Sequence, residues 1–467
     1  MTGGLWAPSR RALTAGLVLT VTFVAAEALA VITVMPVVAR QLHGLRLYGF
    51  VFSAFMLGTV VGIVAAGRQA DRRGPAVPYI AGLLLFGAGL AVSGLAPTMP
   101  VLIAGRSLRG LGAGAIPSMA YVAVGRSLPQ ELQARMMALM STAWVIPGLA
   151  GPAIAAEVTR LTGWRWVFLG LLPFVAVTGP FAIPALRRLG PPAEGTGQAH
   201  RLIQGLGVAA GTGLLLAGLT TVVSAGPTAK VAGALAIIAG AALGIPLLAR
   251  MLPPGTLRAR SGLPATTLIR GMLTFGYFGA DAYVTLAITL VRHHSPALAG
   301  IAVTGATLTW TLGSWFQARM AARWPKRRLI RVGGALILIS VAAFGLMLAP
   351  GVPVTEGIIA WTASGLGMGM AYASVTLLVL AQAPPGREGW AVACLNLADV
   401  LGSTLGIGLG GAAVAATSGA GGHLAAGVAT ALALAAAALA GALLVSRGLP
   451  PGPRPQAVIA AADHAAI

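Results

Sequence analysis

The chain has 467 residues, of which 57% are hydrophobic and only 9% charged, and its formal net charge is +21. With a mean hydropathy of +0.87, this composition excludes an ordinary water-soluble globular protein and indicates an integral membrane protein. The positive charge does not predict a nucleic-acid partner, because it is dispersed over loops between apolar segments, where anionic lipid headgroups can balance it.

Apolar segments long enough to cross a membrane recur along the whole chain. A hydrocarbon core about 30 Å thick requires about 20 apolar residues per helix. Fourteen segments meet this requirement, at residues 12–38, 48–66, 78–96, 99–125, 135–159, 166–186, 203–224, 229–249, 266–291, 297–318, 329–349, 354–381, 389–416 and 422–446. The sequence therefore predicts an all-α integral membrane protein.

Positive charge alternates between the loops. Arg72 and Arg73 follow the second segment and Arg187 and Arg188 the sixth, whereas the turn at residues 97–100 holds no cation. Loops rich in Lys and Arg stay in the cytoplasm, and an even number of segments places both termini on one side. We expect a multi-pass protein of a bacterial cytoplasmic (inner) membrane with both termini in the cytoplasm.

Two polar linkers, at residues 187–201 and 250–264, divide the segments into six, two and six. We expect an N-terminal six-helix bundle at 1–190, cytoplasmic linkers with two additional transmembrane helices at 191–265, a C-terminal six-helix bundle at 266–447 and a disordered cytoplasmic tail at 448–467. The loops 67–76 and 318–327 align without a gap, which favours a duplicated bundle. Similar loop positions alone would also produce this match.

Two ionisable residues in the first half of the chain fall at a common depth. Glu27 lies about 15 residues, or about 22 Å, into its segment, and Arg106 lies about 10 Å deep from the opposite side. An ionisable residue inside a membrane indicates a functional site by default. We favour Glu27 as a proton or cationic-substrate site paired with Arg106; the alternative is a structural ion pair between two helices.

A second set lies near the start of the C-terminal half. Arg270, Thr274, Tyr277 and Asp281 share one helical face, and Asp281 reaches about the midplane. Asp281, with Tyr277 one turn away, can hold a proton that substrate displaces; packing against neighbouring helices is the alternative. Arg270 is expected to extend to the interface.

Asn396 and Asp399 lie one turn apart in a later segment. Their predicted position is compatible equally with transport and with gating. Cys394 is the only cysteine, so a disulfide within the chain and a Cys-based metal site are excluded. No phosphate-binding loop or nucleophile and base arrangement is found, so we expect no enzyme activity, metal or cofactor.

Three motifs stand in the order expected of one transporter family. A loop begins at Gly67 and ends at Gly74, a glycine-rich segment contains Arg106 and Arg109, and a third block holds Gly148, Gly151 and Pro152 before the sequence GWRWVF. They resemble signatures of the major facilitator superfamily, and the third block resembles the signature of its antiporters. Glu27 also precedes Pro36 by the nine residues typical of the family. With two inserted helices, the chain resembles the fourteen-helix drug:proton antiporters.

This resemblance implies the major facilitator fold, with two six-helix bundles, two extra central helices and fourteen helices in total. It implies gating roles for Gly67, Asp71, Arg72 and Gly74, and a role at the bundle interface for Gly148, Gly151 and Pro152. Pro75 replaces a basic residue of the loop signature, Arg109 a glutamine, Glu27 a commoner aspartate and Leu171 a common asparagine. These departures change the charge network that gating would use.

The resemblance implies a proton-coupled exporter of hydrophobic or cationic small molecules such as drugs, working by alternating access. The expected partners are such substrates, protons and membrane lipid, with no nucleic acid, and the expected state is a monomer. An exporter of a lipid or a secreted metabolite, and a non-coupled facilitator, are the alternatives.

Overall fold

The fold is taken from a computed structural model of the chain. It describes all residues except 1–3, 9, 129–131, 133–134, 137–138, 141, 191–198, 223–225, 322, 385–387, 418–422 and 450–467. The side chains of residues 71, 121, 125, 199–202, 388 and 389 also lie outside the description. Almost all of the expected tail at 448–467, and the side chain of Asp71, are therefore outside it.

Helices make up all the regular structure of the described residues. The first half contains α1 (Arg11–Gln41), α2 (Tyr48–Arg73), α3 (Ala76–Gly94), α4 (Met99–Ser127), α6 (Val145–Thr162), α7 (Arg165–Leu169) and α8 (Leu172–Arg187). Then follow α9 (Ala199–Val222) and α10 (Pro227–Met251). The second half contains α11 (Leu263–Leu286), α12 (Pro296–Met320), α13 (Lys326–Leu346), α14 (Val354–Gln382), α15 (Glu388–Thr417) and α16 (Leu424–Val445).

Twelve helical stretches of the described chain are long and apolar enough to cross a membrane. Their number and lengths confirm an all-helical, multi-pass membrane protein. The 29-residue α4 and the 18-residue α6 are not among the twelve. The segment expected at 166–186 is divided into α7 and α8, although together they form one crossing stretch.

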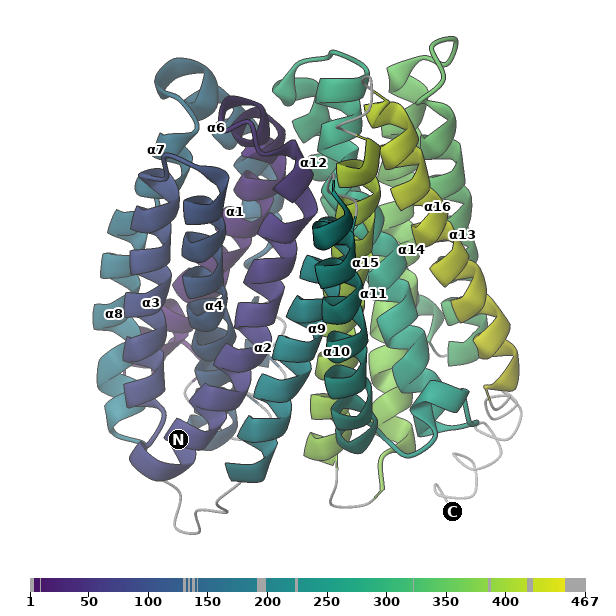
Figure 1. The fold of residues 1–467 in the computed structure, drawn as a ribbon. Helices are drawn as coiled ribbons and strands as arrows, with labels where there is room; N and C mark the ends of the chain where they lie inside the picture. Colours follow the sequence, from purple (N-terminus) through teal and green to yellow (C-terminus); the bar gives the residue numbers. More distant parts are fainter. Residues whose placement is uncertain are drawn as a thin grey trace.

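Two helical bundles stand side by side in Figure 1, with the start of the described chain and the end of α16 (Leu424–Val445) at the lower end of the view. In the first bundle α1 packs on α6 and α8, while α4 packs on α2 and α3. In the second, α11 packs on α15 and α16, and α14 packs on α12 and α13. Sequence-adjacent helices thus share a bundle.

The bundles meet along two seams, where α2 packs against α15 and α6 against α12. Glycine permits a very close approach at the first seam, since a Cβ on Gly49 would overlap the backbone of Gly411. The hairpin of α9 and α10 packs through α9 on both α2 and α15. The two inserted helices therefore cover the first seam from outside.

In the described chain, side-chain hydrogen bonds between the two bundles lie in the half of the molecule away from the termini. The Tyr48 hydroxyl donates to the Ala282 carbonyl at 2.9 Å, and the Ser53 hydroxyl to the Thr404 carbonyl at 3.2 Å. The Thr285 hydroxyl donates to the Ile32 carbonyl at 3.0 Å. The bundles are thus joined at the end opposite the chain ends.

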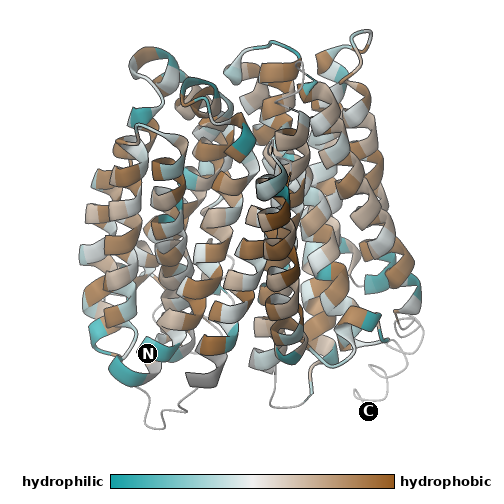
Figure 2. Ribbon diagram, viewed as in Figure 1, coloured by the Kyte–Doolittle hydropathy of each residue, from teal (hydrophilic) through white to brown (hydrophobic). Residues whose placement is uncertain are grey.

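Hydrophobic residues predominate along the middle of the helices, and hydrophilic residues gather toward the two ends of the molecule (Figure 2). The hairpin helix α10 is a clear case, because Val231, Leu235 and Ile238 are all more than half exposed. Such a surface would favour aggregation in water but matches the hydrocarbon of a bilayer.

Candidate functional site

The first buried charge cluster joins α1 to α4. Glu27 is fully buried, and its Oε1 lies 3.2 Å from Nη1 of Arg106. Arg109 pairs with the same oxygen and is itself fully buried. The structure therefore brings together the two residues that sequence depth predicted to meet and adds a second arginine.

The aromatic surroundings of this cluster explain how two guanidinium groups can lie inside an apolar bundle. The Arg106 guanidinium lies 4.6 Å from the Phe55 ring, and its Nε donates to the Val51 carbonyl at 3.2 Å. Arg109 lies 5.4 Å from the Phe168 ring. Cation–π contacts compensate part of the lost hydration. The cluster has two cations and one carboxylate, so Glu27 is firmly held between two arginines.

Arg109 is a residue whose pairing the sequence reasoning missed. It stands three residues after Arg106, so both side chains lie on the same side of α4. Its departure from the glutamine usual in the resembled motif was the signal that could have identified it.

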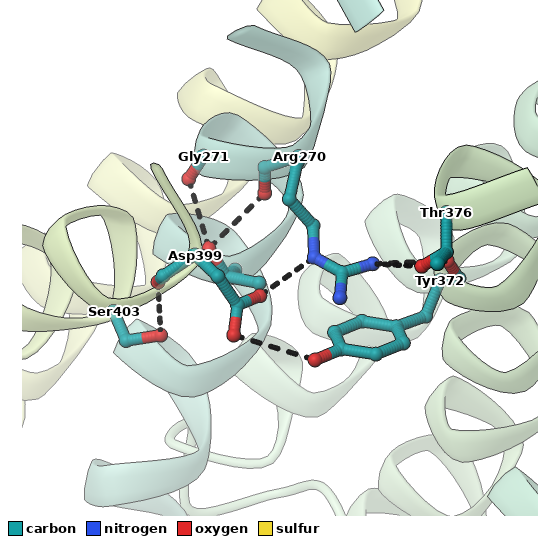
Figure 3. Close-up of polar contacts among 7 residues, drawn as sticks. Arg270, Gly271, Tyr372, Thr376, Asp399 and Ser403 are labelled. Carbon is teal, nitrogen blue, oxygen red and sulfur yellow. Dashed lines mark hydrogen bonds and ion pairs between the residues drawn. The ribbon is translucent and has the colours of Figure 1, made fainter. Parts of the chain in front are cut away.

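The second charge cluster lies inside the other bundle and is shown in Figure 3. Nε of Arg270 in α11 donates to Oδ1 of Asp399 in α15 at 2.7 Å. The Tyr372 hydroxyl, from α14, donates to the other carboxylate oxygen at 3.3 Å. Three helices therefore meet at this carboxylate.

Arg270 contradicts the expectation that it extends to the interface. It is only 2% exposed, its guanidinium carbon lies 3.0 Å from the centre of the Tyr372 ring, and its Nη1 donates to the Tyr372 carbonyl at 2.9 Å. The expectation was wrong because it placed Arg270 by depth alone, whereas Asp399, 129 residues later, supplies a buried partner.

Asp281 lies deeper in the same bundle and is 8% exposed. Among the described residues, no Lys or Arg forms an ion pair with it. Its neighbour Tyr277, one turn away as the sequence predicted, stacks on Trp361 with 5.3 Å between ring centres. Asp281 is therefore a buried carboxyl group in aromatic surroundings.

A row of aromatic rings connects the two acidic positions of this bundle. The Tyr277 ring lies 5.4 Å from that of Trp310 in an edge-on arrangement, and the Trp310 ring lies 5.4 Å from that of Tyr372. Tyr372 in turn bonds Asp399. We call Tyr277, Trp310, Trp361 and Tyr372 the aromatic row.

Asn396 does not join the Asp399 cluster. Its side chain is exposed on α15, and no described hydrogen bond links it to Asp399. Asn396 and Asp399 do lie one turn apart, but of the two only Asp399 faces the neighbouring helices α11 and α14 that supply its partners.

Gly148 and Pro152 of the third motif lie at the second seam, whereas Gly151, also expected at the bundle interface, faces α1 of its own bundle. A Cβ on Gly148 would collide with the Thr307 side chain, and one on Gly300 would lie 3.3 Å from Cβ of Pro152. A Cβ on Gly151 would lie 3.8 Å from Leu29, which is ordinary contact. Gly148 and Pro152 thus allow α6 to pack closely against α12.

The first motif forms the end of α2 and the turn that follows. Gly74 ends α2 with φ of +79°, a conformation that favours glycine. Arg72 and Arg73 are exposed, and a side chain at Gly67 would meet open space. The turn conformation thus explains one glycine of the motif, while the side chain of Asp71 is not described.

Two apolar helical bundles with charged residues buried inside them are typical of membrane transporters, because such groups are costly to place in a membrane and commonly mark transport pathways. Residues 16–347 match the family model described as the Major Facilitator Superfamily. The chain belongs to this superfamily, which identifies a transporter and not an enzyme.

Curated relatives support this placement. A probable multidrug-efflux transporter of Mycobacterium tuberculosis is 26% identical over 409 residues, covering 83% of this chain and 84% of that protein. The methylenomycin A resistance protein of Bacillus subtilis is 25% identical over 355 residues, covering 75% of each. The resemblance to the multidrug-efflux branch is thus confirmed.

Solved structures support the fold. A POT family transporter superposes with a TM-score of 0.66 at 15% identity, covering 93% of this chain and 98% of the other. A D-xylose-proton symporter gives a TM-score of 0.64 at 13% identity, covering 94% and 98%. These similarities establish the major facilitator fold and nothing about substrate.

Proposed function

We propose that this protein is a proton-coupled exporter of hydrophobic or cationic small molecules such as drugs, working by alternating access. The names of the multidrug-efflux and resistance relatives support a drug substrate. The observation that carries proton coupling is Asp281, a buried carboxyl group with no described cationic partner.

Asp281 rather than Glu27 is our candidate for the group that exchanges a proton for substrate. Glu27 is already neutralised by Arg106 and Arg109. Asp281 lacks such a partner, so a proton or a cationic substrate can provide the neutralising charge. Glu27 then has the structural role of locking α1 to α4, which was the alternative from sequence.

The aromatic row provides the substrate surface in this proposal. Tyr277 stands one turn from Asp281 on α11, and its ring packs against the large flat rings of Trp310 and Trp361. Aromatic faces bind apolar and cationic molecules through stacking and cation–π contacts. Asp399, held by Arg270 and Tyr372 at the other end of the row, links substrate binding to movement of α11 against α14 and α15.

Alternating access in this proposal uses the two seams. The described contacts join the bundles at the end away from the termini, so the complementary state separates Tyr48 from Ala282 and Ser53 from Thr404. Gly148 and Pro152 give α6 the close packing on α12 about which such movement occurs.

The remaining expectations complete the proposal. We propose that α4 and α6 also cross the membrane, which raises the twelve apolar stretches to fourteen, and that the protein is a monomer of a bacterial inner membrane with cytoplasmic termini. Arg106 and Arg109 make α4 less apolar than a helix of hydrophobic residues alone, although both are paired with Glu27 and the helix packs against α2 and α3.

Reconstitution in proteoliposomes tests the coupling. Ethidium, an aromatic cation, is added to vesicles with an internal pH dye, and proton movement is recorded for the wild type, Asp281→Asn and Glu356→Gln. Glu356 is an exposed acid at the start of α14 and serves as the matched control. We expect substrate-dependent proton flux in the wild type and control and none in Asp281→Asn.

Three results would contradict the proposal. Full proton flux in Asp281→Asn would assign the proton to another group. Ethidium transport by the wild type with no proton movement would identify a non-coupled facilitator, and a protein that moves a fluorescent lipid but not ethidium would be a lipid exporter.

A further inference from the structure

A basic pocket lies where α13 begins and α16 ends, away from the charge clusters described above. It has a volume of about 620 Å³, and its lining includes Arg327, Arg328, Arg331 and Arg447. Three of these arginines belong to the first turns of α13, and the fourth to the helical turn Ser446–Gly448 directly after α16. Among the residues that the structure describes, no acidic one lines the pocket. We call it the headgroup pocket.

Two of the four arginines are held in place by the protein. Nη1 of Arg327 donates to the Leu449 carbonyl at 3.1 Å, while its Nε is buried without a hydrogen-bond partner among the described residues. The guanidinium of Arg328 lies 4.3 Å from the Trp324 ring. Arg331 and Arg447 are exposed. The pocket therefore offers guanidinium donors that the protein holds in place beside others that are exposed. Such a set of donors favours an anion with several oxygen acceptors, above all a phosphate group.

The pocket continues into an apolar surface. Val332 and Leu444 belong to its lining and are 40% and 58% exposed. Further along α13, Ile339 and Leu346 are also exposed to the surroundings of the bundle. A ligand that matches both parts needs an anionic head and a hydrocarbon chain, and free phosphate lacks the chain.

We propose that the headgroup pocket binds an anionic phospholipid of the leaflet at the same end of the molecule as the chain termini. The phosphate contacts Arg327, Arg331 and Arg447, and an acyl chain lies along Val332 and Leu444. Basic pockets between membrane helices bind anionic headgroups in this way. Since α13 and α16 pack on each other, one bound lipid connects both helices.

Lipid titration of the purified full-length chain tests this site. The protein is stripped of lipid in detergent, titrated with phosphatidylglycerol or phosphatidylcholine, and analysed by native mass spectrometry. The test variant is Arg331→Gln with Arg447→Gln, and the matched control is Arg187→Gln with Arg188→Gln, two exposed arginines at the end of α8. All four side chains are exposed, so we expect neither variant to lose stability. Unchanged melting temperatures would verify that both variants are folded.

We expect the wild type to bind one phosphatidylglycerol molecule in preference to phosphatidylcholine. The pocket variant loses roughly 30-fold in affinity for that molecule, from the usual contribution of two arginines to anionic-lipid binding. The control retains wild-type affinity. Equal losses in both variants would show diffuse attraction to basic loops, and an unchanged pocket variant would place the lipid elsewhere; either result overturns the proposal.

A third variant separates the lipid from its phosphate. Leu444→Gln removes apolar contact but no charge, so it weakens phosphatidylglycerol binding and leaves any effect of inorganic phosphate unchanged. A competition experiment completes the test. If about 10 mM inorganic phosphate displaces the bound lipid to the same extent as an excess of phosphatidylglycerol, the site binds soluble phosphate and the lipid assignment fails.

Discussion

Arg270 lies over the aromatic ring of Tyr372, with 3.0 Å between the guanidinium carbon and the ring centre. The same tyrosine bonds Asp399, the ion-pair partner of Arg270. Each of the three side chains therefore contacts the other two. The ring of Tyr372 contacts Arg270 and its hydroxyl bonds Asp399, so substitutions can remove the two contacts separately.

Tyr372→Phe removes the hydroxyl but retains the ring beneath Arg270, whereas Tyr372→Leu removes both. A hydrogen bond to a charged group contributes about 1.5–3 kcal/mol, and a desolvated cation–π contact about 2 kcal/mol. We expect a moderate loss of transport in Tyr372→Phe and a larger loss, with a lower melting temperature, in Tyr372→Leu. Identical behaviour of the two variants in efflux and melting assays would show that the ring contact contributes nothing.

Glu27→Gln leaves two buried guanidinium groups without a carboxylate. Removing one partner of a buried ion pair costs about 3–5 kcal/mol, so we expect poor expression and early aggregation in detergent. Adding Arg109→Gln removes one of the uncompensated charges and partly restores the melting temperature. If the double variant is no more stable than Glu27→Gln, the two uncompensated arginines are not the cause of the lost stability.

Trp310→Ala interrupts the aromatic row between Tyr277 and Tyr372. Loss of one stacking and cation–π surface corresponds to about 1–2 kcal/mol, so we expect the KM for ethidium to rise roughly 10-fold while the stoichiometry of proton exchange is kept. Trp315→Ala is the matched control, because Trp315 is 59% exposed on the same helix. A similar KM in both variants would remove the aromatic row from the substrate surface.

Gly49→Ala places a methyl group against the backbone of Gly411 and prevents close approach of α2 and α15. We expect the end away from the termini to open. Ser53, fully buried beside Thr404, reports this opening when it is changed to cysteine in a Cys394→Ala chain. Labelling by a membrane-impermeant maleimide from that side is then faster.

Gly351→Ala controls for the added methyl group, because a side chain at Gly351 meets open space. Labelling at Ser53→Cys that is no faster with Gly49→Ala than with Gly351→Ala would mean that this seam does not close the end of the molecule.

The helices and the depths of their charged residues could be predicted from sequence because both follow from the bilayer. An apolar run of fixed length must satisfy its own backbone in hydrocarbon, so it forms a helix, and a constant rise per residue places Glu27 and Arg106 at one depth. The partner of an arginine is a different matter. Depth alone assigned Arg270 to the interface, although Asp399 and Tyr372 hold it inside the bundle.

The sequence by itself determined that this chain is a multi-pass helical membrane protein of a transporter family, since hydropathy and local motifs are properties of consecutive residues. Only the tertiary structure decided which buried charges are compensated: Glu27 by two arginines, Asp399 by Arg270, and Asp281 by no described cation. Pairing between helices depends on how their faces are rotated toward each other, and that rotation is set by close packing at positions such as Gly49 and Gly411 rather than by spacing along the chain.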